Sequence, residues 1–208
     1  MISISRTVEP AILMRNKAKW TNDLLIAASD EERTRALNKY RKPDIKSSLD
    51  KMCNSKCAYC ESKIGHADYE HIEHYKPTSI YPGDAFNWEN LLFACGICNG
   101  NQYKGGRFPD PAAGGPLLNP CVDDPTQHLR FEFDARTKIA VVIGMTLRGV
   151  TTEQHLGLNR PKLVTHRYTW VRNIAALKRL AITDVGANAL YQEAIKSESQ
   201  YAAFARSL

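Results

Sequence analysis

The stretches CAYC at residues 57–60 and CGIC at residues 95–98 decide the fold of this 208-residue chain. Each is a C-x-x-C pair, and 34 residues separate the two pairs. Two such knuckles can place four thiolates around one zinc ion and close a tetrahedral structural site. The sequence therefore predicts a structural Zn²⁺ ion bound by four cysteines: Cys57, Cys60, Cys95 and Cys98.

The sequence indicates a reducing compartment, in which the cysteines remain free thiols or bind metal. The first residues, MISISRTVEPAILMRNK, lack the layout of a signal peptide, and no stretch of the chain is apolar for the roughly 18 residues of a membrane span. We therefore expect a cytoplasmic protein without membrane contact, whose thiols bind metal rather than form disulfides. Cys121 is interpreted as an ordinary thiol, while Cys53 lies close enough to the first knuckle to be an alternative ligand.

The length and composition predict an α+β protein in three regions that form one compact unit. Residues 1–52 read as helical, because Leu13, Trp20 and Leu24 recur at helical spacing and Ser29 to Glu32 matches a capping box. A third helix is predicted around the stripe Ile45, Leu49 and Met52. Residues 53–110 carry little helical periodicity and are rich in Cys, His, Asn and Gly, which is typical of a segment organised by metal.

Residues 111–208 are predicted to hold a loop, a β-hairpin and further helices. In the preceding region, residues 53–110, short strands are expected at 71–75 and 91–94, with a helix that begins near Cys98 or Asn99. The hairpin is expected at 131–133 and 139–143. A helix should start at Pro161, capped by Asn159, and a last helix should run from about Val185 to Phe204.

Between the two knuckles lie residues suited to phosphodiester hydrolysis. Such a reaction needs a base that deprotonates water and a cation that stabilises the leaving oxygen. His74 is a candidate base because imidazole titrates near neutral pH. Glu73 offers a carboxylate and Asn99 a neutral carbonyl oxygen, a pair of ligands that suits Mg²⁺. Since neighbours on a strand face opposite sides, Glu73 and His74 can share a site only where the strand ends or twists.

Two more residues complete this candidate site. Asn90 is expected to hydrogen-bond within the loop that carries His74 and to orient the imidazole. Lys104 follows Asn99 by five residues and is expected to contact the substrate backbone. The zinc-bound Cys98 would hold Asn99 rigidly, and a helix beginning there would also attract phosphate.

These strings resemble a known motif. CAYCE, EHYKP and FNWENLLFACGICNGNQYKG are similar to the HNH nuclease motif with its zinc-knuckled ββα-metal fold. The resemblance implies an endonuclease in which His74 is the general base, Asn90 the middle residue, and Asn99 and Glu73 ligands of a catalytic divalent cation. Many HNH enzymes have aspartate where this chain has Glu73, so His71 and Asp68 remain alternative ligands.

The likeness extends to roughly residues 50–170. PLLNPCVDDPTQHLRFEFD and the later LGLNR resemble the HNH subunits of Septu-type and retron-associated phage-defence modules. Such subunits act with an ATPase of the ABC/SMC type. The resemblance therefore implies an effector nuclease of an antiphage complex, with the flanking helices docking that partner.

A basic stretch is the last candidate for substrate contact. The chain carries a net charge of +6, and seven basic residues but one acid, Glu153, lie between Arg148 and Arg179. Three interpretations are open. The stretch could form a phosphate-contacting surface, in which Arg167 and Arg172 bind the substrate; it could dock a partner; or it could be a solvated helix face.

The competing interpretation of the whole chain is a non-catalytic zinc module that binds nucleic acid or scaffolds a complex. The sequence does not distinguish DNA from RNA as the substrate.

Overall fold

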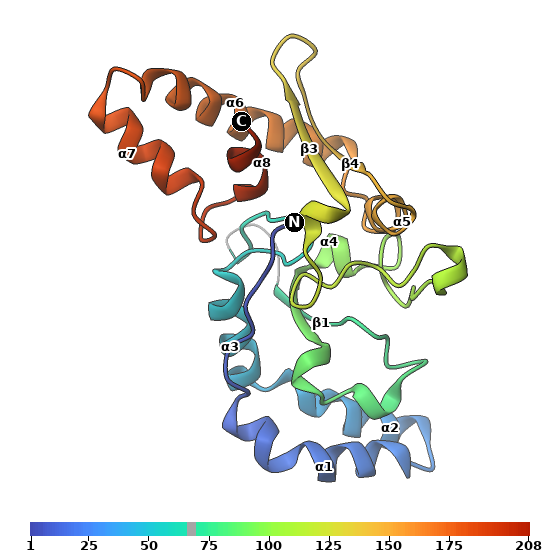
Figure 1. The fold of residues 1–208 in the computed structure, drawn as a ribbon. Coiled ribbons are helices and arrows are strands. Elements are labelled where there is room, and N and C mark those ends of the chain that lie inside the picture. The colour runs from blue at the N-terminus through green and yellow to red at the C-terminus, as the bar shows by residue number, and fades with distance from the viewer. Residues whose placement is uncertain (66–69) are drawn as a thin grey trace.

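The computed structural model describes residues 1–65 and 70–208. The molecule is elongated, with the N-terminal helices at one end, a small sheet in the middle, and a β-hairpin with the C-terminal helices at the other end (Figure 1). Residues 1–10, which form neither helix nor strand, run from the middle of the molecule towards the N-terminal helices (Figure 1). The largest cluster of buried side chains draws on all of these parts, from Met1 to Phe204.

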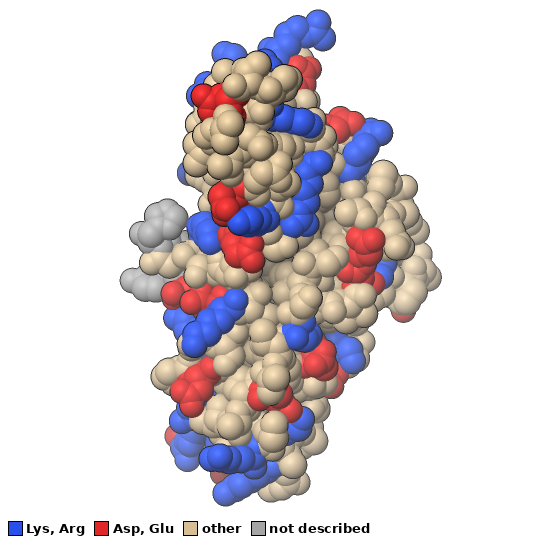
Figure 2. All heavy atoms as spheres, turned by 60° about the vertical axis from the view of Figure 1, so that its left-hand side comes forward, with Lys and Arg blue, Asp and Glu red and all other residues tan. Residues whose placement is uncertain are grey.

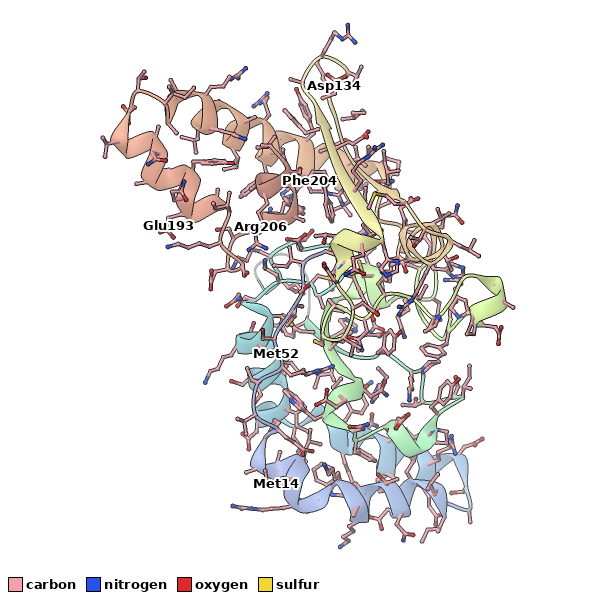
Figure 3. All side chains as sticks on the ribbon, in the orientation of Figure 1. Met14, Met52, Asp134, Glu193, Phe204 and Arg206 are labelled. Atoms are coloured by element: carbon pink, nitrogen blue, oxygen red, sulfur yellow. The ribbon has the colours of Figure 1, made fainter. Side chains whose placement is uncertain are left out.

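The N-terminal region forms the predicted helices. Helix α1 (Ala11–Leu25) buries Leu13, Trp20 and Leu24, and its exposed side includes Met14, which Figure 3 labels at this end of the molecule. Helix α2 (Asp30–Leu37) is capped by Ser29, whose side chain accepts a hydrogen bond from the Glu32 amide. It is followed by the 3₁₀ turn η1 (Asn38–Arg41) and then by α3 (Pro43–Cys53).

The middle of the chain builds a two-stranded antiparallel sheet. Strand β1 (Glu70–His74) pairs with β2 (Leu91–Cys95) in a register that sets Ile72 against Phe93 and His74 against Leu91. The 3₁₀ turns η2 (Pro82–Asp84) and η3 (Trp88–Asn90) shape the connection. Every residue of β2 is buried, because α3 packs on this strand.

The helix after the second knuckle differs from the prediction. Helix α4 spans only Gly96–Asn99, so Asn99 stands at its end and not at its start. Cys95 caps it by accepting a hydrogen bond from the Cys98 amide at 3.4 Å. The expected helix N-terminus at Asn99, with free amides for phosphate, is therefore wrong.

The C-terminal region starts with short turns and the predicted hairpin. After η4 (Pro111–Ala113) and η5 (Pro125–Gln127), strand β3 (Leu129–Asp134) pairs with β4 (Ile139–Gly144). Figure 3 shows Asp134 near the hairpin tip and Phe204 beneath the hairpin, where its ring lies 5.2 Å from that of Phe131. Helix α5 (Leu147–His155), which the sequence analysis did not identify, packs on β4.

The last three helices depart from the prediction in two places. Helix α6 (Pro161–Leu180) starts as expected, but its N-cap is Arg160. Asn159 instead bridges the amide and carbonyl of Val142 on β4, at 2.9 and 2.7 Å. The expected single last helix is two helices, α7 (Val185–Ala194) and α8 (Ala202–Ser207), separated by turns over residues 195–201. Tyr201, the N-cap of α8, has a left-handed conformation with φ of 53°.

Within the described residues, no helix combines the length and the apolar character needed to cross a membrane. Acidic and basic side chains are interspersed over the face presented in Figure 2.

Candidate active site and its zinc centre

The four knuckle cysteines converge on one point. The Sγ atoms of Cys57, Cys60, Cys95 and Cys98 all lie within 4.8 Å of one another, and all four side chains are buried. Four thiolates bound to one Zn²⁺ at about 2.3 Å would stand about 3.8 Å apart, close to the 4.0 Å between the Sγ atoms of Cys60 and Cys95. The donor set fits a tetrahedral zinc ion. Cys53 is outside this cluster, and burial raises the pKa of its thiol to about 12.

A cation from the C-terminal region supports this centre. The Arg160 guanidinium donates to Sγ of Cys98 at 3.6 Å and lies 5.4 Å from the centre of the Tyr103 ring. The same nitrogen donates to the carbonyl of Gly157 at 3.1 Å. A Cβ atom on Gly157 would stand 1.9 Å from the Tyr103 ring. The LGLNR segment therefore fits tightly against the second knuckle, and its positive charge faces the thiolates.

His74 ends β1 and is held on two sides. Its Nε2 lies 2.9 Å from the carbonyl oxygen of Ala85, and its ring packs edge-on against Tyr40 with 4.6 Å between the ring centres. A carbonyl oxygen only accepts, so Nε2 carries the proton and Nδ1 has the free lone pair. Burial lowers the pKa of His74 to about 4, which keeps the imidazole neutral at physiological pH.

Asn90 organises the loop that follows His74. Its Oδ1 accepts from the Lys76 amide at 2.7 Å, and its Nδ2 donates to the carbonyls of Lys76 and Asp84 at 3.0 and 3.1 Å. The Asn90 carbonyl accepts from the Tyr75 amide. The predicted hydrogen bonding of Asn90 within this loop is confirmed. Because Ala85 follows Asp84, these bonds also fix the carbonyl that orients His74.

Glu73 and Lys104 do not lie where the sequence predicted. The Glu73 carboxylate is 2% exposed and forms an ion pair with Lys104, and it accepts from the Tyr59 hydroxyl at 3.4 Å. Lys104 is 1% exposed and also donates to the His74 carbonyl at 2.7 Å. The expected contact of Lys104 with substrate is wrong in this arrangement, because a buried carboxylate neutralises its ammonium. Burial raises the pKa of Glu73 to about 7, against the opposing effect of Lys104.

Asn99 lies instead beside His71. Its Nδ2 is 3.4 Å from Nδ1 of His71, one of the two alternative ligands. The other, Asp68, lies outside the described residues. Alternation along β1 gives His71 and Glu73 one face and His74 the other, which is why Glu73 and His74 do not share a surface here. Asn99 and His71 both line a cleft of about 370 Å³. His74 does not line this cleft, but its ring packs against Tyr40, which does.

The wall of this cleft opposite β1 was missed by sequence reasoning. It is formed by Tyr40 and Arg41 of η1 and by Lys46 of α3. These residues precede the first knuckle, and helical spacing marks only the buried face of their segment. The tripeptide Tyr40-Arg41-Lys42, an aromatic residue beside two cations, was the available signal.

The basic stretch is not one surface. Three of its seven basic residues are occupied inside the molecule: Arg148 binds Asp123 at 2.7 Å, Arg160 faces Cys98, and Arg167 is 1% exposed. Arg167 donates to the carbonyls of Ala140 and Leu158 at 2.9 and 2.8 Å, and its guanidinium lies 4.8 Å from the Phe204 ring centre. The prediction that Arg167 contacts phosphate is therefore wrong, because its guanidinium is buried and donates to backbone carbonyls. Arg172 is exposed on α6.

Strands β1 and β2 form an antiparallel sheet beside the two C-x-x-C knuckles. A histidine ends the first strand, and an asparagine follows the last cysteine. This arrangement defines an HNH domain with paired cysteine knuckles. The HNH endonuclease family matches residues 57–105. Most of the chain resembles two Septu proteins named PtuB. One, from Bacillus thuringiensis, is 34% identical over 161 residues, which is 77% of this chain and 55% of that protein.

The other, from Bacillus mycoides, is 31% identical over 214 residues, which covers 88% of this chain and 71% of that protein. The chain belongs to the PtuB family of Septu proteins. It spans little more than half the length of the first of these relatives.

Proposed function

We propose that this protein is a metal-dependent endonuclease that hydrolyses phosphodiester bonds in nucleic acid. The observation that carries the proposal is the oriented, neutral His74, whose ring packs against Tyr40, a residue that lines the same cleft as Asn99. A non-catalytic zinc scaffold would not need an imidazole whose proton is fixed on one nitrogen. The match of residues 57–105 to the HNH endonuclease family supports the same reading.

His74 is the proposed general base. With Nε2–H directed at the Ala85 carbonyl, Nδ1 is free to accept a proton from an attacking water. The contact with Tyr40 restrains the ring, and the hydrogen bonds of Asn90 hold the loop that carries Ala85. Asn90 is therefore a positioning residue in this proposal.

A divalent cation, Mg²⁺ or another, is the proposed catalytic cofactor beside the structural zinc. When bound, it would stabilise the charge that develops on the leaving oxygen. Asn99 is the proposed ligand from the second knuckle. From β1, His71 is already beside Asn99, whereas Glu73 would first have to leave Lys104. His71 is therefore favoured over Glu73 as the second protein ligand.

We further propose that the nuclease is the effector of an antiphage defence complex in the cytoplasm. The names of the two relatives associate them with Septu. An ATPase of the ABC/SMC type is the proposed partner, on the strength of the family resemblance. The net charge of +6 suits a nucleic-acid substrate.

The test is cleavage of duplex DNA, single-stranded DNA and tRNA, each with Mg²⁺ or with a chelator, and with and without the co-expressed ATPase. His74→Ala should reduce the rate by about 10²–10⁴-fold while zinc content and nucleic-acid binding persist. His128→Ala is the control, because that histidine binds Thr146 in the C-terminal region. Cleavage by His74→Ala at the unmodified rate would make the non-catalytic zinc module the better reading.

The ligands are separated by their metal dependence. Asn99→Ala and His71→Ala should each raise the Mg²⁺ concentration that gives half-maximal rate, and excess metal should restore part of the activity. Glu73→Gln should leave this concentration unchanged. The opposite pattern, with Glu73→Gln sensitive and His71→Ala insensitive, would assign the ligand role to Glu73.

A further inference from the structure

An arginine outside the matched HNH residues lines the same cleft. Arg41 ends η1 and is exposed. Two other charged side chains line the cleft, Lys46 and Glu70, and they pair with each other at 2.7 Å. Arg41 forms no ion pair with any described residue, so its charge remains available to a ligand that enters the cleft.

Tyr40 holds this arginine close to the proposed base. Nε of Arg41 lies 3.1 Å from the Tyr40 hydroxyl, and the guanidinium carbon is 5.5 Å from the centre of the Tyr40 ring. The same ring packs against His74 at 4.6 Å. One aromatic side chain therefore contacts both the cation and the imidazole. With Nε engaged, and with no described residue hydrogen-bonded to them, the two terminal nitrogens of the guanidinium can donate as a fork.

We propose that Arg41 binds a backbone phosphate of the nucleic-acid strand that occupies this cleft, and that Tyr40 positions it. The inference rests on the proposed nuclease function and adds a substrate contact from the N-terminal helical region. A planar guanidinium with two free nitrogens matches phosphate oxygens in a bidentate way. Lys46 is less suited to this contact, because Glu70 already neutralises it.

The experiment measures binding separately from cleavage. In a His74→Ala background, the affinity for a 30-nucleotide single strand, the matching duplex DNA and the matching RNA is followed by fluorescence anisotropy over a range of salt concentrations. Arg41→Gln should weaken binding roughly tenfold at low salt, as expected for loss of a charged hydrogen bond. It should also reduce the slope of log K against log salt by about one.

Three variants sharpen the assignment. Arg41→Lys should restore the salt slope but not the full affinity, since lysine supplies a point charge without the fork. Tyr40→Phe should give an intermediate loss of affinity, because it removes the hydroxyl that Arg41 contacts. Arg33→Gln is the matched control, because Arg33 is exposed on α2 and does not line the cleft.

The outcomes distinguish the two proposals. If Arg41→Gln binds all three probes as Arg33→Gln does, the Arg41 site is wrong, while cleavage by the unmodified protein would still support the nuclease. If the unmodified protein neither binds nor cuts any probe, the nuclease proposal fails and the Arg41 site fails with it. Loss of affinity without a change in salt slope would also contradict a phosphate contact.

Discussion

Lys104 and Glu73 form the most buried ion pair between two side chains near the site, and each depends on the other. Burying a charge is costly unless a partner neutralises it, so removing one member should be far worse than removing both. This pair connects the loop after the second knuckle to β1. It also explains why a lysine five residues after Asn99, which reads as a substrate contact in the sequence, is a structural residue.

At a pH well above the pKa of about 7 of Glu73, where its carboxylate is charged, Lys104→Met should therefore lower the free energy of unfolding by about 3 kcal/mol. The double variant Glu73→Gln with Lys104→Met should recover most of that loss. Urea unfolding of the zinc-loaded protein measures both. Lys46→Met is the control, because its pair with Glu70 is partly exposed and should contribute less than about 1 kcal/mol. Equal losses from the two lysine variants would contradict this account of Lys104.

His74 should remain neutral far into the acid range. Burial moves its pKa from 6.5 to about 4, so the folded protein binds fewer protons at this residue than the unfolded chain does between those values. The base should therefore stay unprotonated, and the rate of cleavage should not fall through His74 protonation between pH 7.5 and 6. Nitrogen NMR of labelled histidine should show the Nε2–H tautomer at pH 7. A titration of His74 near pH 6.5 would contradict this prediction.

At the scale of elements, the sequence predicted the helices, the cap and the strands that depend on residues close together in the chain. Apolar spacing locates α1 and α3, and the Ser29 capping box locates the start of α2. The strands expected at 131–133 and 139–143 lie within β3 and β4. The sequence could not give features set by long-range contacts. Asn159 reads as an N-cap but binds β4, and turns over residues 195–201 divide one apparent helix into two.

The N-terminus of α6 supports the zinc centre through Arg160. Arg160→Met should lower zinc affinity by about 10–100-fold, as loss of a group that hydrogen-bonds to a metal ligand commonly does. Competition with a chromophoric chelator measures the affinity. In the Co²⁺-substituted protein the thiolate-to-cobalt absorption band should also shift, because Sγ of Cys98 loses a donor.

Arg172→Met is the control for that experiment, because this arginine is exposed on the same helix. A merely structural role for Arg160 would lower stability and leave the absorption band in place. If the two variants bind Zn²⁺ and Co²⁺ alike, the contact with Cys98 does not support the metal.

At the scale of the whole molecule, the four clustered cysteines lie within a core to which every region of the chain contributes. The largest buried cluster contains Leu13 and Leu49 from the N-terminal helices, Phe93 from β2, and Val171 and Phe204 from the C-terminal helices. A structural zinc site contributes on the order of 10 kcal/mol to folding. Since β2 ends at Cys95, one of the four clustered cysteines, we expect the contacts of its buried residues with α3 to depend on the metal.

Zinc removal should therefore unfold more than the knuckles. With zinc bound, an alkylating reagent should label Cys121 first, because it is the one cysteine among six that is not buried. Chelation should expose the four ligands together and reduce the helical signal in circular dichroism. Metal analysis should find about one zinc per chain beforehand. Retention of the full helical signal after complete zinc loss would contradict this coupling.

The sequence predicted some of the candidate site and not the rest, for a physical reason. His74, Asn90 and the cysteines belong to a local motif whose spacing fixes their surroundings. Whether a charged residue faces solvent depends on elements far along the chain. Arg167 is buried by α8 and β4, and Tyr40 with Arg41 reaches the cleft from a segment that precedes the first knuckle.

The position of Arg160 gives α6 the mechanics of a lever. The helix has 20 residues and is therefore about 30 Å long. At its N-terminus, Arg160 contacts Cys98 of the second knuckle. Further along, Arg167 is hydrogen-bonded to the backbone of β4 and acts as the fulcrum. The far end of the helix leads to α7, away from the β3–β4 hairpin (Figure 1). A displacement of α7 would therefore be transmitted along α6 to Cys98 and, through it, to the adjacent Asn99, which lines the cleft.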